Sequence, residues 1–324
     1  MNQKRSLSFF PPCQSAVLCV LGLFLAAPAS FAAAVTGSIH EPFDYTVGTL
    51  FSNPSTLNGG QGWNLTGTLA PNDPAVPWGT TLNGGAAAGT YRTATPGLSY
   101  VATGYLPVSG NALTLDALTP NANQNIGRSL GGQVIDSGTT YFSLLMSKNN
   151  DTTRTINWAF FNGTSERFAI GQIGASAGNS GGNLALLMNN QNPAGLIQSA
   201  SPIAMGVGIT HLLIGRIDWN SAGFETVTLW VDPTDVTSEG AAGAAYASTA
   251  AFELTALTGV RPFVGNGATV GGSPVPGVSA NFDEFRLGGS WESVTSLAVV
   301  PEPTTAALLG LGAVSLALRR RIGR

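Results

Sequence analysis

The sequence predicts an all-β protein built as a two-sheet β-sandwich. Between residues 35 and 297, apolar residues rarely recur at helical spacing and instead alternate with polar ones in short runs. Glycine, asparagine and proline separate these runs, as they do in the turns of antiparallel sheets. About a dozen such strands fit a single sandwich without a second domain.

The expected strands follow one another along the chain. Phe142, Leu144 and Met146 share one face of the run 141–146, which is the period-two pattern of a strand with one buried face. Asn162-Gly163-Thr164 is a turn signal that joins two neighbouring runs into a hairpin. The other expected strands are 156–161, 167–173, 211–219, 226–231 and 281–287.

Three segments lack this alternation. The segment 53–89 is rich in glycine, asparagine and proline, and we expect it to be a loop that contains Trp63 and Trp78. Residues 174–182 form a glycine-rich connector. The alanine-rich segment 240–251 is expected to add one or two helical turns at the edge of the sandwich.

Residues 1–34 predict a signal peptide. Two basic residues precede an apolar stretch at 16–27, and small residues follow it. Ala32 and Ala34 suit a signal peptidase, with Val35 as the first mature residue. The alternative is an uncleaved membrane anchor, which a short apolar stretch ending in small residues fits less well.

The C-terminal residues 298–324 combine three physical features. Two prolines around a carboxylate cannot continue a helix or a sheet ladder, so they hold an extended segment. The apolar run 306–318 spans about 20 Å as a helix, shorter than the roughly 30 Å of a bilayer core. The arginines that follow are retained on the cytoplasmic side. The run is therefore expected to be a transient transmembrane anchor.

This order of parts resembles the PEP-CTERM sorting signal of Gram-negative bacteria. The resemblance implies recognition and cleavage by a membrane protease of the exosortase type. The residues expected to carry sorting and processing are Pro301, Glu302, Pro303, Arg319, Arg320 and Arg321.

The body from 35 to 297 is acidic and has no thiol. It contains 8 of the 14 basic residues and 16 of the 17 acidic ones, so its formal charge is −8. This charge argues against nucleic acid and anionic membranes as partners and is compatible with neutral polysaccharide or calcium. Both cysteines, Cys13 and Cys19, leave with the signal peptide, which excludes disulfides and thiolate chemistry.

The segments 211–218, 226–233 and 282–288 resemble the strands of the laminin-G/concanavalin A-like jelly roll. The resemblance implies a concanavalin A-like β-sandwich over 35–297, with the signal peptide before it and the sorting helix after it. Because the matching motifs are structural, they support the fold and leave the function open.

Catalytic patterns are weak. Glycoside hydrolases of this fold place two carboxylates on one face of a strand, whereas Asp283 and Glu284 are adjacent and predicted to face opposite ways. Glu284 and Arg286 are expected to form a surface pair, while Asp283 caps a strand end or hydrogen-bonds a turn. His40 and His211 are interpreted as structural. We therefore expect no enzyme, and the alternative is a secreted glycan-active enzyme with a diverged site.

Two kinds of binding site remain as hypotheses. Asp232 and Asp235 form an oxygen-rich turn and Asp218 ends the partner strand, which suggests calcium as the one candidate cofactor. Trp63 and Trp78 lie in loop-rich sequence and are the candidate platforms for a sugar ring. Tryptophans on strands are expected to be core residues instead.

The expected protein is thus a non-enzymatic component of the outer envelope, cell surface or extracellular matrix, structural or adhesive in role. Its predicted processing partners are signal peptidase and exosortase. Exopolysaccharide is the candidate ligand, and the C-terminal helix would anchor the chain transiently in the inner membrane.

Overall fold

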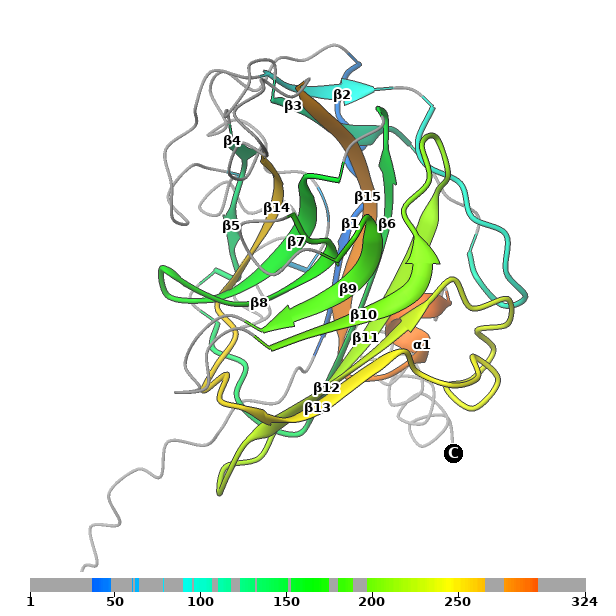
Figure 1. The fold of residues 1–324 in the computed structure, drawn as a ribbon. Helices are drawn as coiled ribbons and strands as arrows, with labels where there is room; N and C mark the ends of the chain where they lie inside the picture. The colour runs from blue at the N-terminus through cyan, green and yellow to red at the C-terminus, as the bar shows by residue number, and fades with distance from the viewer. Residues whose placement is uncertain are drawn as a thin grey trace, which may run out of the picture. The chain divides into compact units, whose positions relative to one another are not determined.

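The computed structural model describes residues 37–47, 60, 62–63, 78, 90–94, 96–106, 110–117, 123–131, 133–150, 153–174, 180–188, 197–265 and 277–296. These residues form two antiparallel sheets, which confirms the predicted all-β sandwich (Figure 1). The predicted signal peptide, the domain boundaries and the sorting helix lie outside the described residues. Among the described residues, no helix has the length and apolar character needed to cross a bilayer.

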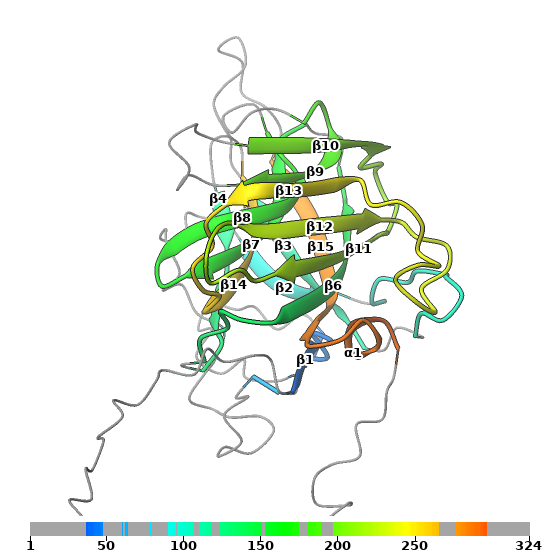
Figure 2. The ribbon, with the colours of Figure 1, turned by 90° about the horizontal axis from the view of Figure 1, so that it is seen from below.

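The first sheet has eight strands in the order β13-β12-β11-β6-β15-β3-β2, with β1 paired to β15. Figure 2 shows β13, β12, β11 and β6 in this order. Its strands are β1 (Ser38–Glu41), β2 (Thr90–Ala94), β3 (Ala112–Ala117), β6 (Thr139–Lys148), β11 (His211–Asp218), β12 (Glu225–Val231), β13 (Ala247–Phe252) and β15 (Val278–Gly288).

The second sheet has seven strands in the order β10-β9-β8-β7-β14-β4, with β5 paired to β14. Its strands are β4 (Asn123–Asn125), β5 (Arg128–Ser129), β7 (Thr155–Asn162), β8 (Ser165–Gln172), β9 (Asn183–Met188), β10 (Ile197–Ala204) and β14 (Gly259–Gly265). The predicted hairpin is present as the antiparallel pair of β7 and β8.

The core lies between the two sheets and is rich in aromatic rings. The rings of Phe160 and Phe168 stack with centroids 4.2 Å apart, and Phe142 from the first sheet lies 4.6 Å from Phe160. Burying each such side chain contributes about 1.5–3 kcal/mol. Gly215 is required beside them, because a Cβ there would lie 1.9 Å from Cζ of its cross-strand partner Phe142.

The outer face of the first sheet is also apolar. Alternate residues of β6, β11 and β12, among them Leu145, Ile214 and Trp230, pack in a second buried cluster with Trp291. The short helix α1 (Glu292–Thr295) closes over this face, and Ser143 Oγ donates a hydrogen bond to the Val294 carbonyl at 2.6 Å. Strand alternation therefore buries both faces of the central strands.

The alanine-rich segment was wrongly expected to be helical. Residues 247–252 form β13, the edge strand that pairs with β12. Sheet pairing overrides the helix propensity of alanine here, because an antiparallel partner supplies the backbone hydrogen bonds.

Candidate functional site

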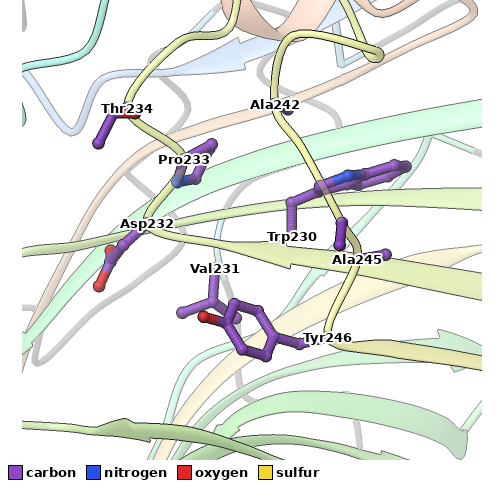
Figure 3. A pocket seen from close by; sticks show the side chains of 9 residues that line it. Trp230, Val231, Asp232, Pro233, Thr234, Ala242, Ala245 and Tyr246 are labelled. Carbon is purple, nitrogen blue, oxygen red and sulfur yellow. The ribbon is translucent and has the colours of Figure 1, made fainter.

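A pocket of about 370 Å³ lies where β12 ends and the loop toward β13 begins (Figure 3). It combines aromatic, small apolar and carboxylate side chains, and the loop with Ala242 and Ala245 passes beside the Trp230 indole. The lining residues are Trp230, Val231, Asp232, Pro233, Thr234, Ala242, Ala244, Ala245 and Tyr246.

Asp232 is held in place by the neighbouring strand β11. Its Oδ2 lies 2.7 Å from Nδ1 of His211, and its Oδ1 accepts a hydrogen bond from the Leu212 amide at 2.9 Å. Because a carboxylate only accepts, the imidazole proton of this pair lies on Nδ1. Asp232 has a φ of 51°, a left-handed conformation that aspartate tolerates better than most residues. Its side chain is 22% exposed, so the carboxylate is partly accessible to solvent.

Two aromatic rings also line the pocket. Trp230 is buried, and its Nε1 donates to the Gly243 carbonyl at 3.1 Å, which ties the loop to the strand. Tyr246 is 41% exposed. The Tyr100 hydroxyl donates a hydrogen bond to the carbonyl of Pro233, the residue after Asp232. Burial and, secondarily, the negative charge of Asp232 raise the pKa of Tyr100 to about 12. The pocket thus has a fixed carboxylate, a packed indole and an accessible phenol ring.

Strand β15 carries a second histidine–carboxylate pair. The register with β6 shifts between Asp283 and Arg286, and Glu284 has a φ of 50°. Glu284 Oε2 lies 2.7 Å from His40 Nε2 and accepts a hydrogen bond from Arg286 Nη2 at 2.6 Å. The predicted pair of Glu284 and Arg286 therefore exists, but its expected place on the surface is wrong, because both residues are buried.

The Asp283 carboxylate ties the segment 96–106 to the bulge of β15. Its Oδ2 accepts a hydrogen bond from the Leu98 amide and its Oδ1 from the Glu284 amide, both at 2.8 Å. It thereby fixes the segment 96–106 over the strand. Burial and, secondarily, the Glu284 charge raise the pKa of Asp283 to about 9. Both carboxylates are 0% exposed, so neither can reach a polysaccharide.

The predicted sugar platforms are wrong, because Trp63 and Trp78 are 3% and 0% exposed and belong to the core. They enclose a buried ion pair, in which Arg128 Nη1 lies 2.6 Å from Glu41 Oε2. The guanidinium carbon is 4.1 Å from the Trp63 ring centroid, and Trp78 Nε1 donates to Glu41. Burial raises the pKa of Glu41 and lowers that of Arg128, while the opposite charge counters each shift.

The three aspartates proposed as calcium ligands are not brought together. Asp218 pairs with Thr226 at one end of the β11–β12 hairpin, whereas the Asp232 amide bonds to Leu212 at the other end. The prediction failed because antiparallel pairing places the end of one strand beside the start of the next. Asp235 instead accepts hydrogen bonds from Thr237. Among the described residues, no three His, Cys, Asp or Glu side chains cluster as metal ligands.

The remaining predicted sites lie outside the described residues: Ala32, Ala34, Val35, Pro301, Glu302, Pro303, Arg319, Arg320 and Arg321. Trp230 was interpreted as a core residue and is buried, and it also lines the pocket. His211 was interpreted as structural, and it holds the Asp232 carboxylate. Sequence reasoning missed Tyr246, which lines the pocket and lies within the alanine-rich segment. A lone aromatic residue in such a segment is the only local signal that was available.

Comparison with known proteins identifies the tail. Residues 299–321 match the PEP-CTERM protein-sorting motif, which marks the chain as an exported protein of a Gram-negative-type bacterium, sorted by exosortase. A search of curated proteins found no match.

Several solved structures are similar to the body. An endo-beta-1,4-glucuronan lyase from the fungus Trichoderma reesei is 14% identical with a TM-score of 0.44, covering 64% of this chain and 90% of that one. A cellulose induced protein, Cip1, is 11% identical with a TM-score of 0.43, covering 66% and 91%. An alginate lyase, Aly36B, in complex with alginate trisaccharide, is 13% identical with a TM-score of 0.40, covering 78% and 98%.

Proposed function

We propose that this exported protein is a non-enzymatic, glycan-binding component of the cell surface or extracellular matrix, and that the pocket at the end of β12 is its sugar site. The observation that carries the proposal is the pairing of an accessible aromatic ring, Tyr246, with an oriented and accessible carboxylate, Asp232, in one pocket. The host's exopolysaccharide is the proposed ligand.

The chemistry of the pocket suits a sugar. The apolar CH face of a pyranose ring packs against an aromatic ring, while the hydroxyl groups need acceptors. A carboxylate offers about four acceptor positions, and the protein uses one on each oxygen of Asp232. The remaining positions can accept hydrogen bonds from two sugar hydroxyls, and such bonds to a charged acceptor are strong.

The non-enzymatic part of the proposal rests on the described carboxylates. Glycosidic hydrolysis commonly needs two carboxylates facing the scissile bond. The described pocket lining includes one, Asp232, and the adjacent acids Asp283 and Glu284 are fully buried. The alternative is a glycan-active enzyme, and sugar release in the test below would favour it.

Processing and location complete the proposal. Signal peptidase would cut before Val35, the apolar run 306–318 would hold the chain transiently in the inner membrane, and exosortase would then act near Pro301-Glu302-Pro303. Mass spectrometry of protein from the host is expected to find a new C-terminus near these residues. Intact Arg324 on all mature protein would contradict it.

Retention of the exported protein on the host's exopolysaccharide tests the pocket directly. We expect Tyr246→Ala to weaken binding about tenfold and Asp232→Asn about fivefold, in the range seen when key contacts are removed. Phe224→Ala is the matched control, because Phe224 is 51% exposed in the turn at the opposite end of the hairpin. Equal loss in the variants of Tyr246 and Phe224 would reject the pocket as the binding site.

A further inference from the structure

The Asp232 carboxylate at the end of β12 is held by groups that carry no positive charge. Its Oδ1 accepts a hydrogen bond from the Leu212 amide, and its Oδ2 accepts one from His211 Nδ1. The other ring nitrogen of His211, Nε2, is buried and has no hydrogen-bond partner among the described residues. A second ring proton would be buried there without an acceptor, which favours the neutral imidazole.

The described surroundings of the pocket do not supply a cation for this carboxylate. The residues that line the pocket include one acid and no lysine or arginine. Arg216 approaches the Trp230 indole, with its guanidinium carbon 6.0 Å from the ring centroid. However, its nitrogens pair with the carboxylates of Asp218 and Glu239. The segment 232–246 contains three acids and no base, so the pocket lies in a negative part of the molecule.

The pocket is open to a ligand of the size of a sugar. Its volume of about 370 Å³ lies in the range of small-molecule sites, roughly 300–1,000 Å³. Asp232 is partly exposed and Tyr246 is exposed. Figure 3 shows Asp232 at one side of the pocket and Trp230 and Ala245 at the other. A sugar ring in this pocket can place one of its substituents at the carboxylate.

We propose that the pocket selects an amino sugar whose amino group is not acetylated, such as a glucosamine unit of a polysaccharide. The inference rests on the proposed sugar site and names the class of sugar that it takes. An ammonium group carries only donors and a positive charge, and its hydrogen bonds to a carboxylate are roughly twice as strong as those between neutral groups. Acetylation would remove this charge, and a uronate would place a like charge beside Asp232.

Oligosaccharides of glucose, glucosamine and N-acetylglucosamine test the inference, because oligomers of the same linkage and length differ in only one substituent of each ring. Isothermal titration calorimetry of the exported protein, at a mildly acidic pH where the amino groups are protonated, measures the three affinities. We expect the glucosamine oligomer to bind about tenfold more tightly than the other two. Asp232→Asn is expected to remove this preference, because an amide has no charge to attract the ammonium group.

Two further variants separate the carboxylate from its surroundings. Asp235→Asn is the matched control, because it removes the same charge from the same turn at a residue that does not line the pocket. It is expected to change the preference for glucosamine less than about twofold. Tyr246→Ala is expected to weaken all three oligomers by a similar factor and to keep the preference, since the ring contacts the apolar face that the three sugars share.

The outcomes distinguish this inference from the sugar site on which it rests. Equal affinities for the three oligomers, or tightest binding of the acetylated one, would overturn the inference and leave the sugar site in place if Tyr246→Ala weakens binding. Equal loss of the preference in the Asp232 and Asp235 variants would assign it to the acidic surface as a whole and overturn it too. Retention on the host's exopolysaccharide without binding of the glucosamine oligomer would overturn the inference alone, whereas absence of both would reject the sugar site as well.

Discussion

The two histidine–carboxylate pairs of this protein have the same geometry and opposite exposure. In each, an acid with a φ near 50° lies 2.7 Å from an imidazole nitrogen. At the β15 bulge, Glu284 is fully buried and His40 is 28% exposed. At the end of β12, Asp232 is 22% exposed and His211 is 3% exposed. One site presents its histidine to solvent and the other presents its carboxylate.

The difference shows that a strained acid beside a histidine is not by itself a binding site. Glu284 is enclosed by Arg286 and by the segment that Asp283 fixes, so its strain serves the packing of the bulge. His211 holds one oxygen of Asp232, while the carboxylate stays partly exposed and lines the same pocket as Trp230 and Tyr246. Exposure, rather than backbone strain, distinguishes the two pairs, and the proposed binding role of Asp232 depends on that exposure.

The largest expected effect that separates the two pairs is on stability. Glu284→Gln removes the anion that Arg286 faces in a buried setting, and breaking such a pair costs about 3–5 kcal/mol. Urea denaturation of the variant and the parent protein measures this difference. If Glu284→Gln lowered the free energy of unfolding no more than Asp232→Asn does, the buried and the exposed pair would not differ in their contribution to stability.

The pH dependence of stability sharpens the description of the buried pair. The pKa of Asp283 is raised to about 9, so its contribution to stability is complete below the pKa of an unfolded aspartate and is lost as the pH rises toward 9. Between pH 5 and 8 this one group lowers the free energy of unfolding by about 1 kcal/mol per pH unit. Asp283→Asn cannot ionise and is expected to flatten this slope.

Urea denaturation at pH 5, 6, 7 and 8 measures the slope. The variant also loses an acceptor for one of two amides, so its stability at a single pH is not the test. Parallel profiles for the parent and the variant would show that Asp283 ionises normally and that the bulge is open to water.

Several strands could be predicted from the sequence, whereas the burial and mutual positions of the candidate site residues could not. Alternation predicted β6, β7, β8, β11, β12 and β15, because each buries one face in the core. It could not predict the burial of Glu284, since a local pattern does not reveal that residues 96–106 cover the outer face. Likewise, Asp218 and Asp232 could be placed correctly only once the antiparallel register was known. Trp63 and Trp78 are buried in the core against rings and an arginine from distant parts of the sequence, which a local pattern does not reveal.

A smaller effect is expected at the exposed pair. Asp232→Asn keeps a residue that tolerates positive φ and loses the charge on a partly exposed acceptor, so the free energy of unfolding is expected to fall by about 1 kcal/mol. The same variant is expected to weaken the proposed sugar binding, whereas Glu284→Gln is expected to leave it unchanged. Denaturation and retention measured on both variants check this. A large stability loss without a binding defect in Asp232→Asn would assign it a packing role like that of Glu284.

The smallest effect is expected at Asp235, which lies in the same turn as Asp232 but does not line the pocket. Hydrogen bonds from the Thr237 hydroxyl and amide lower its pKa, and the group is exposed, so Asp235→Asn should shift the unfolding midpoint less than Asp232→Asn. Thermal unfolding with calcium and with chelator extends the test. The parent and the Asp235 variant are expected to respond to neither, because Asp218 lies at the opposite end of the hairpin from the turn that holds Asp232 and Asp235. A calcium-dependent rise that Asp235→Asn removes would make this turn an ion site, and Asp232 would then hold a cation rather than a sugar hydroxyl.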